Sequence, residues 1–223
     1  MAASGLTYLQ IVNRCLERLR EDSVAAYNST TYSTFIAGIV NQVKAEIEGA
    51  YPWLPMRNTY EVSAVIGTTG YALTGAGMNA RILDAWNTTT GQQLTPGTNA
   101  EFNRHFFGQT GGVPTGPVTK YLVAGLDASY DLQIDIYPSP SATNTLKFNV
   151  FKPQADLAAS SDVPLVPQNV LIEETIARAL VEKGDESAPR PLPGETFILK
   201  DLLGAAVAAN ASHDPGEMDW EVE

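Results

Sequence analysis

The stretch from Thr31 to Arg57, TYSTFIAGIVNQVKAEIEGAYPWLPMR, constrains the fold of this chain more than any other. Its apolar residues recur at alternating steps of four and three, which is the period of an amphipathic helix with one broad buried face. The apolar face consists of Phe35, Ile36, Ile39, Val40, Val43, Ile47, Ala50 and Leu54. The residues expected on the opposite, solvated face are Asn41, Gln42, Lys44, Glu46 and Glu48.

Two prolines end this helix and leave an aromatic residue just beyond it. Pro52 and Pro55 prevent its continuation, and Trp53 stands between them. A Thr- and Val-rich region starts near Asn58, so Trp53 is predicted to act as a wedge between two layers of structure.

Further helices are expected at both ends of the chain. Thr7 to Gln10 reads as a capping box that opens a helix reaching about Arg20. Residues 167–184 and 197–211 show the helical period again. Glu174 and Arg178 are four residues apart and are expected to pair on the solvated side of their helix.

Between these helices, Asn58 to Lys152 has the character of β-structure. The predicted strands are TYEVSAVI, YALT, RILDAWN, VTKYLVAG, YDLQIDIYP and NTLKFNVFK, separated by glycine- and proline-rich turns. Alternation is clearest from Tyr130 to Tyr137, which places Asp131 and Asp135 on a polar face. The segment from Ala100 to Gly116 is rich in glycine toward its end and is predicted to form a long mobile loop.

These elements predict an α+β protein. A helical bundle of the N- and C-terminal helices (1–57 and 153–212) carries an inserted antiparallel β-sandwich or small barrel (58–152). Residues 213–223 are acidic and uncapped, which predicts a flexible tail.

Composition excludes several classes of function. The chain carries 14 basic and 25 acidic residues, a net charge of −11, without the basic clusters that grip nucleic acid. No apolar run approaches the roughly 18 residues that span a bilayer, and the first ten residues lack the blocks of a signal peptide, so synthesis in the cytoplasm is the default expectation. The single cysteine, Cys15, is expected to be a small buried residue.

A search for catalytic chemistry finds little. His105 and His213 have no ligand or base partner at a suitable spacing, and Gly75-Ala76-Gly77 lacks the third glycine of a dinucleotide fingerprint. Asp131 and Asp135 are spaced as paired carboxylates could be, although such alternation is common on a wet sheet face. We therefore expect no catalytic site, metal or cofactor.

Three local patterns resemble the head-to-tail adaptor proteins of short-tailed bacteriophages, the class that includes tail tubular protein A. The first is a helical hairpin that runs into the aromatic end around Trp53. The second is GPVTKY (116–121), followed after a strand by IYPSP (136–140). The third is VPLVP (163–167), which leads into the helix ending at Gly184.

The resemblance implies a structural virion protein at the head-tail junction, made in the host cytoplasm. Twelve subunits would form a ring beneath the portal protein, extend the DNA channel, help to retain the genome and provide a platform for the tail nozzle. Double-stranded DNA would pass without specific binding, and the net negative charge predicts an acidic channel wall.

Contact residues are assigned on this basis. Phe35, Ile39 and Trp53 are predicted to pack the subunits, with the helical layer supplying much of the ring interface. The loop phenylalanines Phe102, Phe106 and Phe107 are predicted to contact a neighbouring subunit or the nozzle, or else to plug the end of the β-domain. In the tail, the alternating residues Met218, Trp220 and Val222 are predicted to bind the portal protein.

Two other classes remain open. One is a β-sandwich module that binds a carbohydrate or protein ligand, with Trp86 and Tyr121 as candidate stacking rings. The other is a hydrolase with its site around His105.

Overall fold

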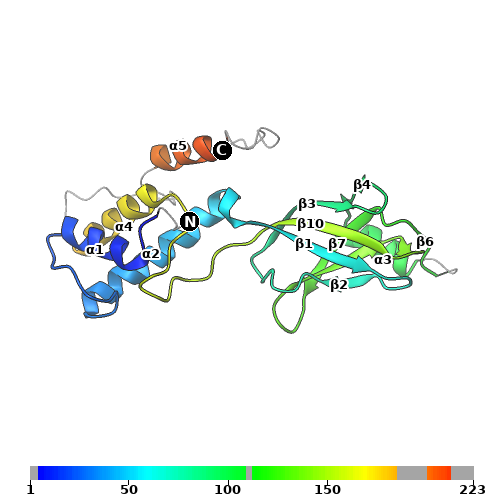
Figure 1. Ribbon diagram of the computed structural model, residues 1–223, viewed down its shortest axis with the longest axis horizontal. Coiled ribbons are helices and arrows are strands. Elements are labelled where there is room, and N and C mark those ends of the chain that lie inside the picture. Colours follow the sequence, from blue (N-terminus) through cyan, green and yellow to red (C-terminus); the bar gives the residue numbers. More distant parts are fainter. Residues whose placement is uncertain (1–4, 109–111, 185–199, 212–223) are drawn as a thin grey trace. The chain divides into compact units, whose positions relative to one another are not determined.

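The computed structural model describes residues 5–108, 112–184 and 200–211 (Figure 1). The chain divides into two compact units. The helical unit comprises 1–55 and 154–223, and the β-unit comprises 56–153. Within the described residues the protein is α+β, with five α-helices and several antiparallel or mixed sheets, none of which closes into a barrel.

The four longer helices follow the apolar periods of the sequence. They are α1 (Tyr8–Arg18), α2 (Thr31–Ala50), α4 (Gln168–Glu182) and α5 (Lys200–Ala211). The predicted capping box is confirmed, since the Thr7 side chain accepts from the Gln10 backbone while the Gln10 side chain accepts from Thr7. A short 3-10 turn, η1 (Leu54–Met56), follows the prolines that end α2.

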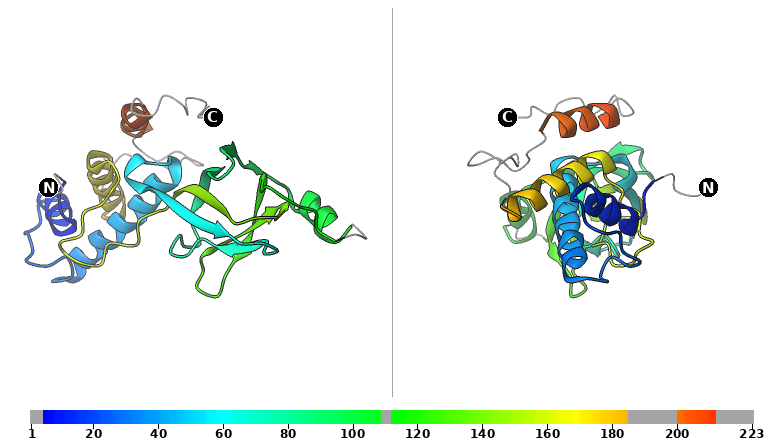
Figure 2. Two further views of the ribbon diagram at one scale, coloured as in Figure 1. Left: turned by 45° about the vertical axis from the view of Figure 1, so that its right-hand side comes forward. Right: turned by 90° about the vertical axis from the view of Figure 1, so that its left-hand side faces the viewer.

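The core of the helical unit lies where α1, α2 and α4 pack on one another (Figure 2). Each helix contributes its apolar face. Fully buried members include Ile11, Val12, Ile36, Val40, Val43, Ile47, Val170 and Leu171. The Tyr8 hydroxyl crosses from α1 and donates a 2.8 Å hydrogen bond to the Ala37 carbonyl on α2. Cys15 is fully buried, as predicted, and burial raises its pKa to about 12.

All six predicted strands are present, together with four short ones. The long strands are β1 (Arg57–Ala64), β3 (Arg81–Asn87), β7 (Lys120–Leu126), β8 (Leu132–Tyr137) and β10 (Asn144–Phe151), and the sixth predicted strand is β2 (Gly70–Ala72). The short additions are β4 (Gln92–Gln93), β5 (Thr95–Pro96), β6 (Thr115–Gly116) and β9 (Ser139–Pro140).

These strands form two four-stranded sheets and one small pair. The first sheet has the order β1-β10-β3-β4 and the second β2-β8-β7-β5, while β6 pairs with β9. One buried cluster draws on both larger sheets, with Leu146, Phe148 and Val150 from the first and Ile134 and Ile136 from the second. Inward and outward residues alternate along β8, as the sequence predicted.

The chain enters and leaves the β-unit at the same end of the antiparallel pair β1–β10. Arg57, which begins β1, pairs with Phe151, which ends β10, and at the other end of the two strands Ala64 pairs with Asn144. Helix α3 (Asn99–Phe106) and the β6–β9 pair lie at this second end (Figure 1).

Candidate functional site

Helix α3 occupies the first half of the segment that was predicted to be a long mobile loop. That prediction is wrong for residues 100–106, because they belong to α3, which Thr98 caps by accepting a 3.3 Å hydrogen bond from the Glu101 backbone. The glycines that suggested mobility begin at Gly108, beyond the helix. The sequence signal that was overlooked is the Thr-x-x-Glu spacing of Thr98 and Glu101.

The three phenylalanines of this segment differ in their surroundings. Phe102 is buried, and its ring stands edge-on to those of Phe106 and Tyr137. Phe106 is half-buried, whereas the side chain of Phe107 is 83% exposed. Phe102 therefore plugs the end of the β-unit, which was one of the two predicted roles, and Phe107 is the residue of the three that a partner can reach.

Polar and aromatic contacts fix α3 to the sheet. Lys120 of β7 forms an ion pair with Glu101, and this hydrogen bond lowers the pKa of the Glu101 carboxyl. His105 lies on α3 and not in the predicted loop, and its ring stacks on Tyr137 with the ring centres 4.0 Å apart. Its Nε2 is 3.9 Å from Glu101, too far for a hydrogen bond, and Nδ1 has no hydrogen-bond partner within the described residues. The histidine serves here as a packing surface for Tyr137.

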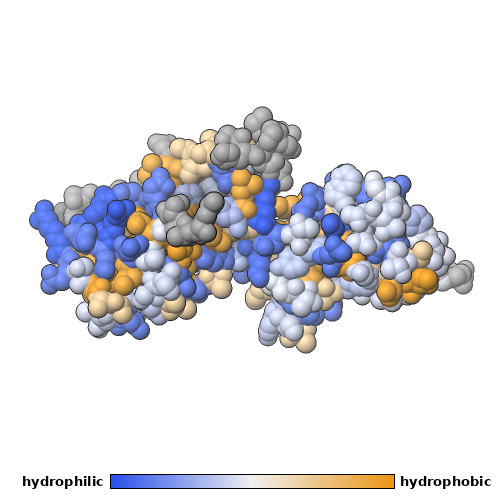
Figure 3. Space-filling view, in the orientation of Figure 1, coloured by the Kyte–Doolittle hydropathy of each residue, from blue (hydrophilic) through white to orange (hydrophobic). Residues whose placement is uncertain are grey.

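Three exposed hydrophobic side chains lie at this end of the β-unit, and together they are called the distal tip. We define it by Val65, Ile66 and Phe107, whose side chains are 46%, 66% and 83% exposed. The backbone of Gly67, next to Ile66, donates to the Pro140 carbonyl at 3.3 Å, which ties the turn after β1 to strand β9. Figure 3 shows hydrophobic atoms on the surface of this end of the β-unit.

The two halves of the GPVTKY and IYPSP pattern lie side by side at the same end. Gly116 pairs with Pro140 in the β6–β9 ladder, and Lys120 pairs with Tyr137 in the β7–β8 ladder. The Thr119 backbone also donates a 3.0 Å hydrogen bond to the Tyr137 carbonyl. Segments about 20 residues apart in the sequence thus form one small structural unit, on which Phe102 and His105 rest.

In the helical unit, the residues predicted to pack the subunits divide into two groups. Trp53 is buried, donates from its indole nitrogen to the Ile47 carbonyl at 2.8 Å, and stands edge-on to Tyr51. Ile39 is also buried. Both side chains are shielded within the single chain, and their assignment to a subunit interface stays a prediction. Phe35, 40% exposed and stacked on Tyr32, remains available.

Two charged residues predicted on the solvated face of α2 are in fact buried. The Lys44 ammonium lies 3.0 Å from the Glu48 carboxylate and donates a 2.7 Å hydrogen bond to the Gln154 carbonyl. Burial raises the pKa of Glu48, although its hydrogen bond to Lys44 acts in the opposite direction. The signal for this site is the four-residue spacing from Val40 through Lys44 to Glu48, which continues the buried stripe.

A second group of charges joins α2 to α4. Arg178 donates 2.8 Å and 2.6 Å hydrogen bonds to the two carboxylate oxygens of Glu46, and a 2.9 Å bond to Glu174. The predicted pairing of Glu174 with Arg178 is confirmed, but Glu174 is buried and does not lie on the solvated side. The hydrogen bonds to Glu46 raise the pKa of the guanidinium, which stays charged.

The residues of the other predicted sites are not assembled into one. Tyr121 is buried edge-on against Phe148, so it cannot offer a stacking face beside the exposed Trp86. Asp131 is buried and not solvated as predicted: it accepts 2.8 Å and 2.9 Å hydrogen bonds from the backbones of Gly75 and Gly77. These bonds lower its pKa, whereas burial raises that of Asp135.

The part of the chain that the structure describes holds neither a metal-binding cluster nor a membrane-spanning helix. There, no group of three or more His, Cys, Asp or Glu side chains is placed to hold a metal ion. None of the described helices is both long and apolar enough to cross a membrane. The tail residues Met218, Trp220 and Val222 lie outside the described residues, so their portal contact stays a prediction.

No protein-family model matches the sequence, and no curated protein matches it at a significant level.

Proposed function

We propose that this protein is a structural subunit of the head-to-tail junction of a short-tailed phage. Copies of the chain assemble into a ring, twelvefold by resemblance, that docks beneath the portal protein, extends the DNA channel, helps to retain the genome and receives the tail nozzle. The observation that supports this most is the pairing of the GPVTKY and IYPSP segments beside the exposed distal tip. The pattern that carries the resemblance thus forms the base of a contact surface.

The architecture used by this proposal is a helical bundle with an inserted antiparallel β-sandwich. In its favour, α1, α2 and α4 share one core and the two four-stranded sheets share another. Each core is closed within its own unit, so contacts between copies fall to surface residues. We assign the distal tip to the nozzle or a neighbouring copy, and Phe35 to the interface of the helical layer.

Charge supports the passage of DNA without retention on the wall. With 25 acidic and 14 basic residues, a ring of many copies carries a large negative charge. A negative channel repels the phosphate backbone and lets the duplex slide. The proposal therefore expects little binding of duplex DNA at physiological salt.

The test is assembly on portal-bearing heads. Purified protein is incubated with heads that have a portal but no tail, and the complexes are imaged by electron microscopy with and without nozzle protein. We expect a ring at the portal vertex to which the nozzle then attaches. Heads that stay bare, or tight salt-sensitive binding of the free protein to duplex DNA, would count against the proposal.

A further inference from the structure

The β-unit leaves two strand edges open on the same side. Strand β5 pairs with β7 only at Lys120 and Tyr121, so within the described residues no strand pairs with the outer edge of 122–126. Likewise β4 pairs with β3 only at Trp86 and Asn87, which leaves the outer edge of 81–84 without a partner strand in the described chain. Open edges of this kind are templates for a further strand.

The open edge of β7 lacks the charges and prolines that usually protect such an edge, although a β-bulge interrupts the strand between Val123 and Gly125. Natural edge strands carry lysine, proline or inward-pointing charges. The sequence of 122–126 is Leu-Val-Ala-Gly-Leu, with no charge and no proline. Val123 and Leu126 are 43% and 44% exposed. An uncharged, apolar and partly exposed edge is typical of a surface that another chain covers.

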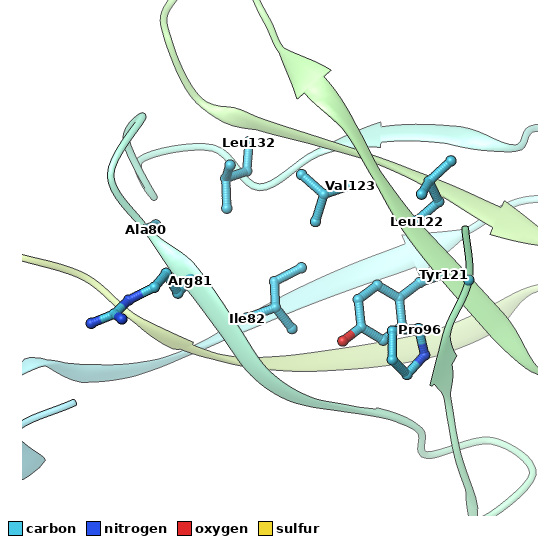
Figure 4. A pocket seen from close by; sticks show the side chains of 9 residues that line it. Ala80, Arg81, Ile82, Pro96, Tyr121, Leu122, Val123 and Leu132 are labelled. Atoms are coloured by element: carbon cyan, nitrogen blue, oxygen red, sulfur yellow. The ribbon is translucent and has the colours of Figure 1, made fainter. Parts of the chain in front are cut away.

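A partly open hollow of about 380 Å³ lies beside this edge, between β7 and β3 (Figure 4). Its walls are mainly apolar, from Ile82 on one side, Val123 on the other, and Leu132 at the end. Arg81 lines it as well, with the guanidinium carbon 4.8 Å from the centre of the Phe151 ring. An extended strand along β7 would form backbone hydrogen bonds with the edge and place alternate side chains in the hollow.

The occupant must be a segment of about five residues that alternates apolar and polar residues and lacks proline. Three of the four segments outside the described residues fail this test. Residues 1–4 and 109–111 are too short. Residues 185–199 contain Pro189, Pro191 and Pro193, and the proline-free end of that segment, Glu-Thr-Phe-Ile-Leu (195–199), does not alternate. Residues 218–222, Met-Asp-Trp-Glu-Val, satisfy it. Their five residues match the five of the open edge, and their apolar members Met218, Trp220 and Val222 suit the mainly apolar walls of the hollow.

We infer that residues 218–222 of a second copy add a strand to the open edge of β7 and place Trp220 in the hollow between β7 and β3. This rests on the proposed ring, because a strand given by each copy to the next is a head-to-tail contact that a closed rotation can repeat. It places the tail within the ring, and not on the portal protein as the resemblance implies.

The environment of Trp220 in the full-length chain reports on this pairing. The chain has three tryptophans, and labelling them with 5-fluorotryptophan gives three fluorine signals. Trp53 is 2% exposed and Trp86 is 41% exposed, so they provide a buried and an exposed reference in the same spectrum. The Trp220 signal is identified as the one that is lost in Trp220→Phe. The exposure of each tryptophan is measured from the change of its fluorine shift with solvent, over a range of protein concentrations and without portal protein. Sedimentation of the same samples reports how far the chain has assembled.

We expect Trp220 to be shielded like Trp53 in the assembled chain and exposed after dilution. Val123→Glu should expose it, whereas Leu165→Glu, at a residue of similar exposure in the helical unit, should not. Trp220→Ala should weaken assembly about 30-fold, the loss typical of a truncated anchor tryptophan. Glu221→Ala, at an alternate position, should weaken assembly by less than about 3-fold.

Three results would overturn the inference: Trp220 exposed in the assembled protein, shielding that does not depend on concentration, or shielding only after portal protein is added. Rings with an exposed Trp220 would refute the strand exchange and leave the proposed function intact. Shielded Trp220 in assemblies that never close into rings would refute the ring and leave the strand exchange intact.

Discussion

Lys44 and Glu48, one turn apart on α2, form a 3.0 Å ion pair in which both side chains are almost completely shielded from water. Removing one member of such a pair leaves an uncompensated buried charge. We expect Lys44→Met to lower the free energy of unfolding by about 3–5 kcal/mol at pH 7, as measured by urea denaturation.

The pH dependence of that variant identifies the cause. The pKa of Glu48 is raised in the folded chain, so the folded state holds the proton more tightly than the unfolded state does. Stability from this group is lost as pH rises through the folded pKa, and Lys44→Met should therefore recover part of its loss relative to wild type between pH 7 and about pH 5. The double variant Lys44→Met/Glu48→Leu should return to within about 1 kcal/mol of wild type. A double variant as unstable as the single one would refute this explanation.

The Asp131 carboxylate holds the turn at Gly75 and Gly77 through two backbone hydrogen bonds. Because its folded pKa is lowered, its contribution to stability is present above the unfolded pKa and is lost as pH falls through the folded pKa. Asp131→Asn should be less stable than wild type at pH 7, and the difference in melting temperature should shrink steadily below about pH 4. A constant difference from pH 7 to pH 2 would show that the charge plays no part.

Gly97 and Gly38 make a matched pair for the same substitution. A methyl group on Gly97 would overlap the ring of buried Phe102, so Gly97→Ala should destabilise the protein by about 1–3 kcal/mol. Gly38 lies on the exposed side of α2 with nothing near its missing Cβ, so Gly38→Ala should stabilise it by about 0.5–1 kcal/mol. Urea denaturation of both variants checks the signs. Equal effects would mean that the ring of Phe102 gives way freely.

Substitutions of Phe102 and Phe107 distinguish a role in packing from a role in contact with a partner. Phe102→Ala should cost about 3–5 kcal/mol in unfolding free energy, because it opens a cavity in the β-unit. Phe107→Ser should change stability by less than about 0.5 kcal/mol. If the distal tip binds the nozzle, Phe107→Ser rings should still dock on heads while losing nozzle attachment in electron micrographs. Normal attachment would remove Phe107 from the contact surface.

Cys15 provides a probe of unfolding. Its thiol is fully buried with a pKa of about 12, so very little thiolate exists at pH 8 and reagents cannot reach it. Labelling with iodoacetamide should be negligible in the native chain and should follow the urea unfolding curve. Rapid labelling in the absence of urea would indicate local opening of α1.

The elements that apolar periodicity could identify were predicted well. The stripe of α2 and the alternation of β8 depend only on which residues avoid water, and both are present. The spacing of Val40, Lys44 and Glu48 places Lys44 on the buried stripe, but its hydrogen-bond partner, the Gln154 carbonyl, lies 110 residues later in the chain and could not be read from the helix. Helix α2 is contacted by two helices, α1 and α4, and by the extended segment at Gln154. More than one of its faces is therefore buried, and a prediction with one buried and one solvated face does not hold.

The candidate surfaces were predicted less well, for a related reason. The glycine content suggested a loop around Phe102. The Thr98 cap and the packing of Phe102 against the Tyr137 ring stabilise a helix there instead. Phe35 and Ile39 are neighbours on one face of the helix, and only the packing of neighbouring helices decides which of them is exposed. The open edges of β3 and β7 follow from how far β4 and β5 extend, which no local pattern specifies.

The pairing of Arg57 with Phe151 has a mechanical consequence. Both connections to the helical unit leave from the same end of the antiparallel pair β1–β10, so a force acting between the two units pulls on one rung of that ladder at a time. Rungs loaded one after another yield at lower force than rungs sheared together. Under tension the β-unit would therefore unzip from its attached end, and the distal tip would be the last part to lose its shape.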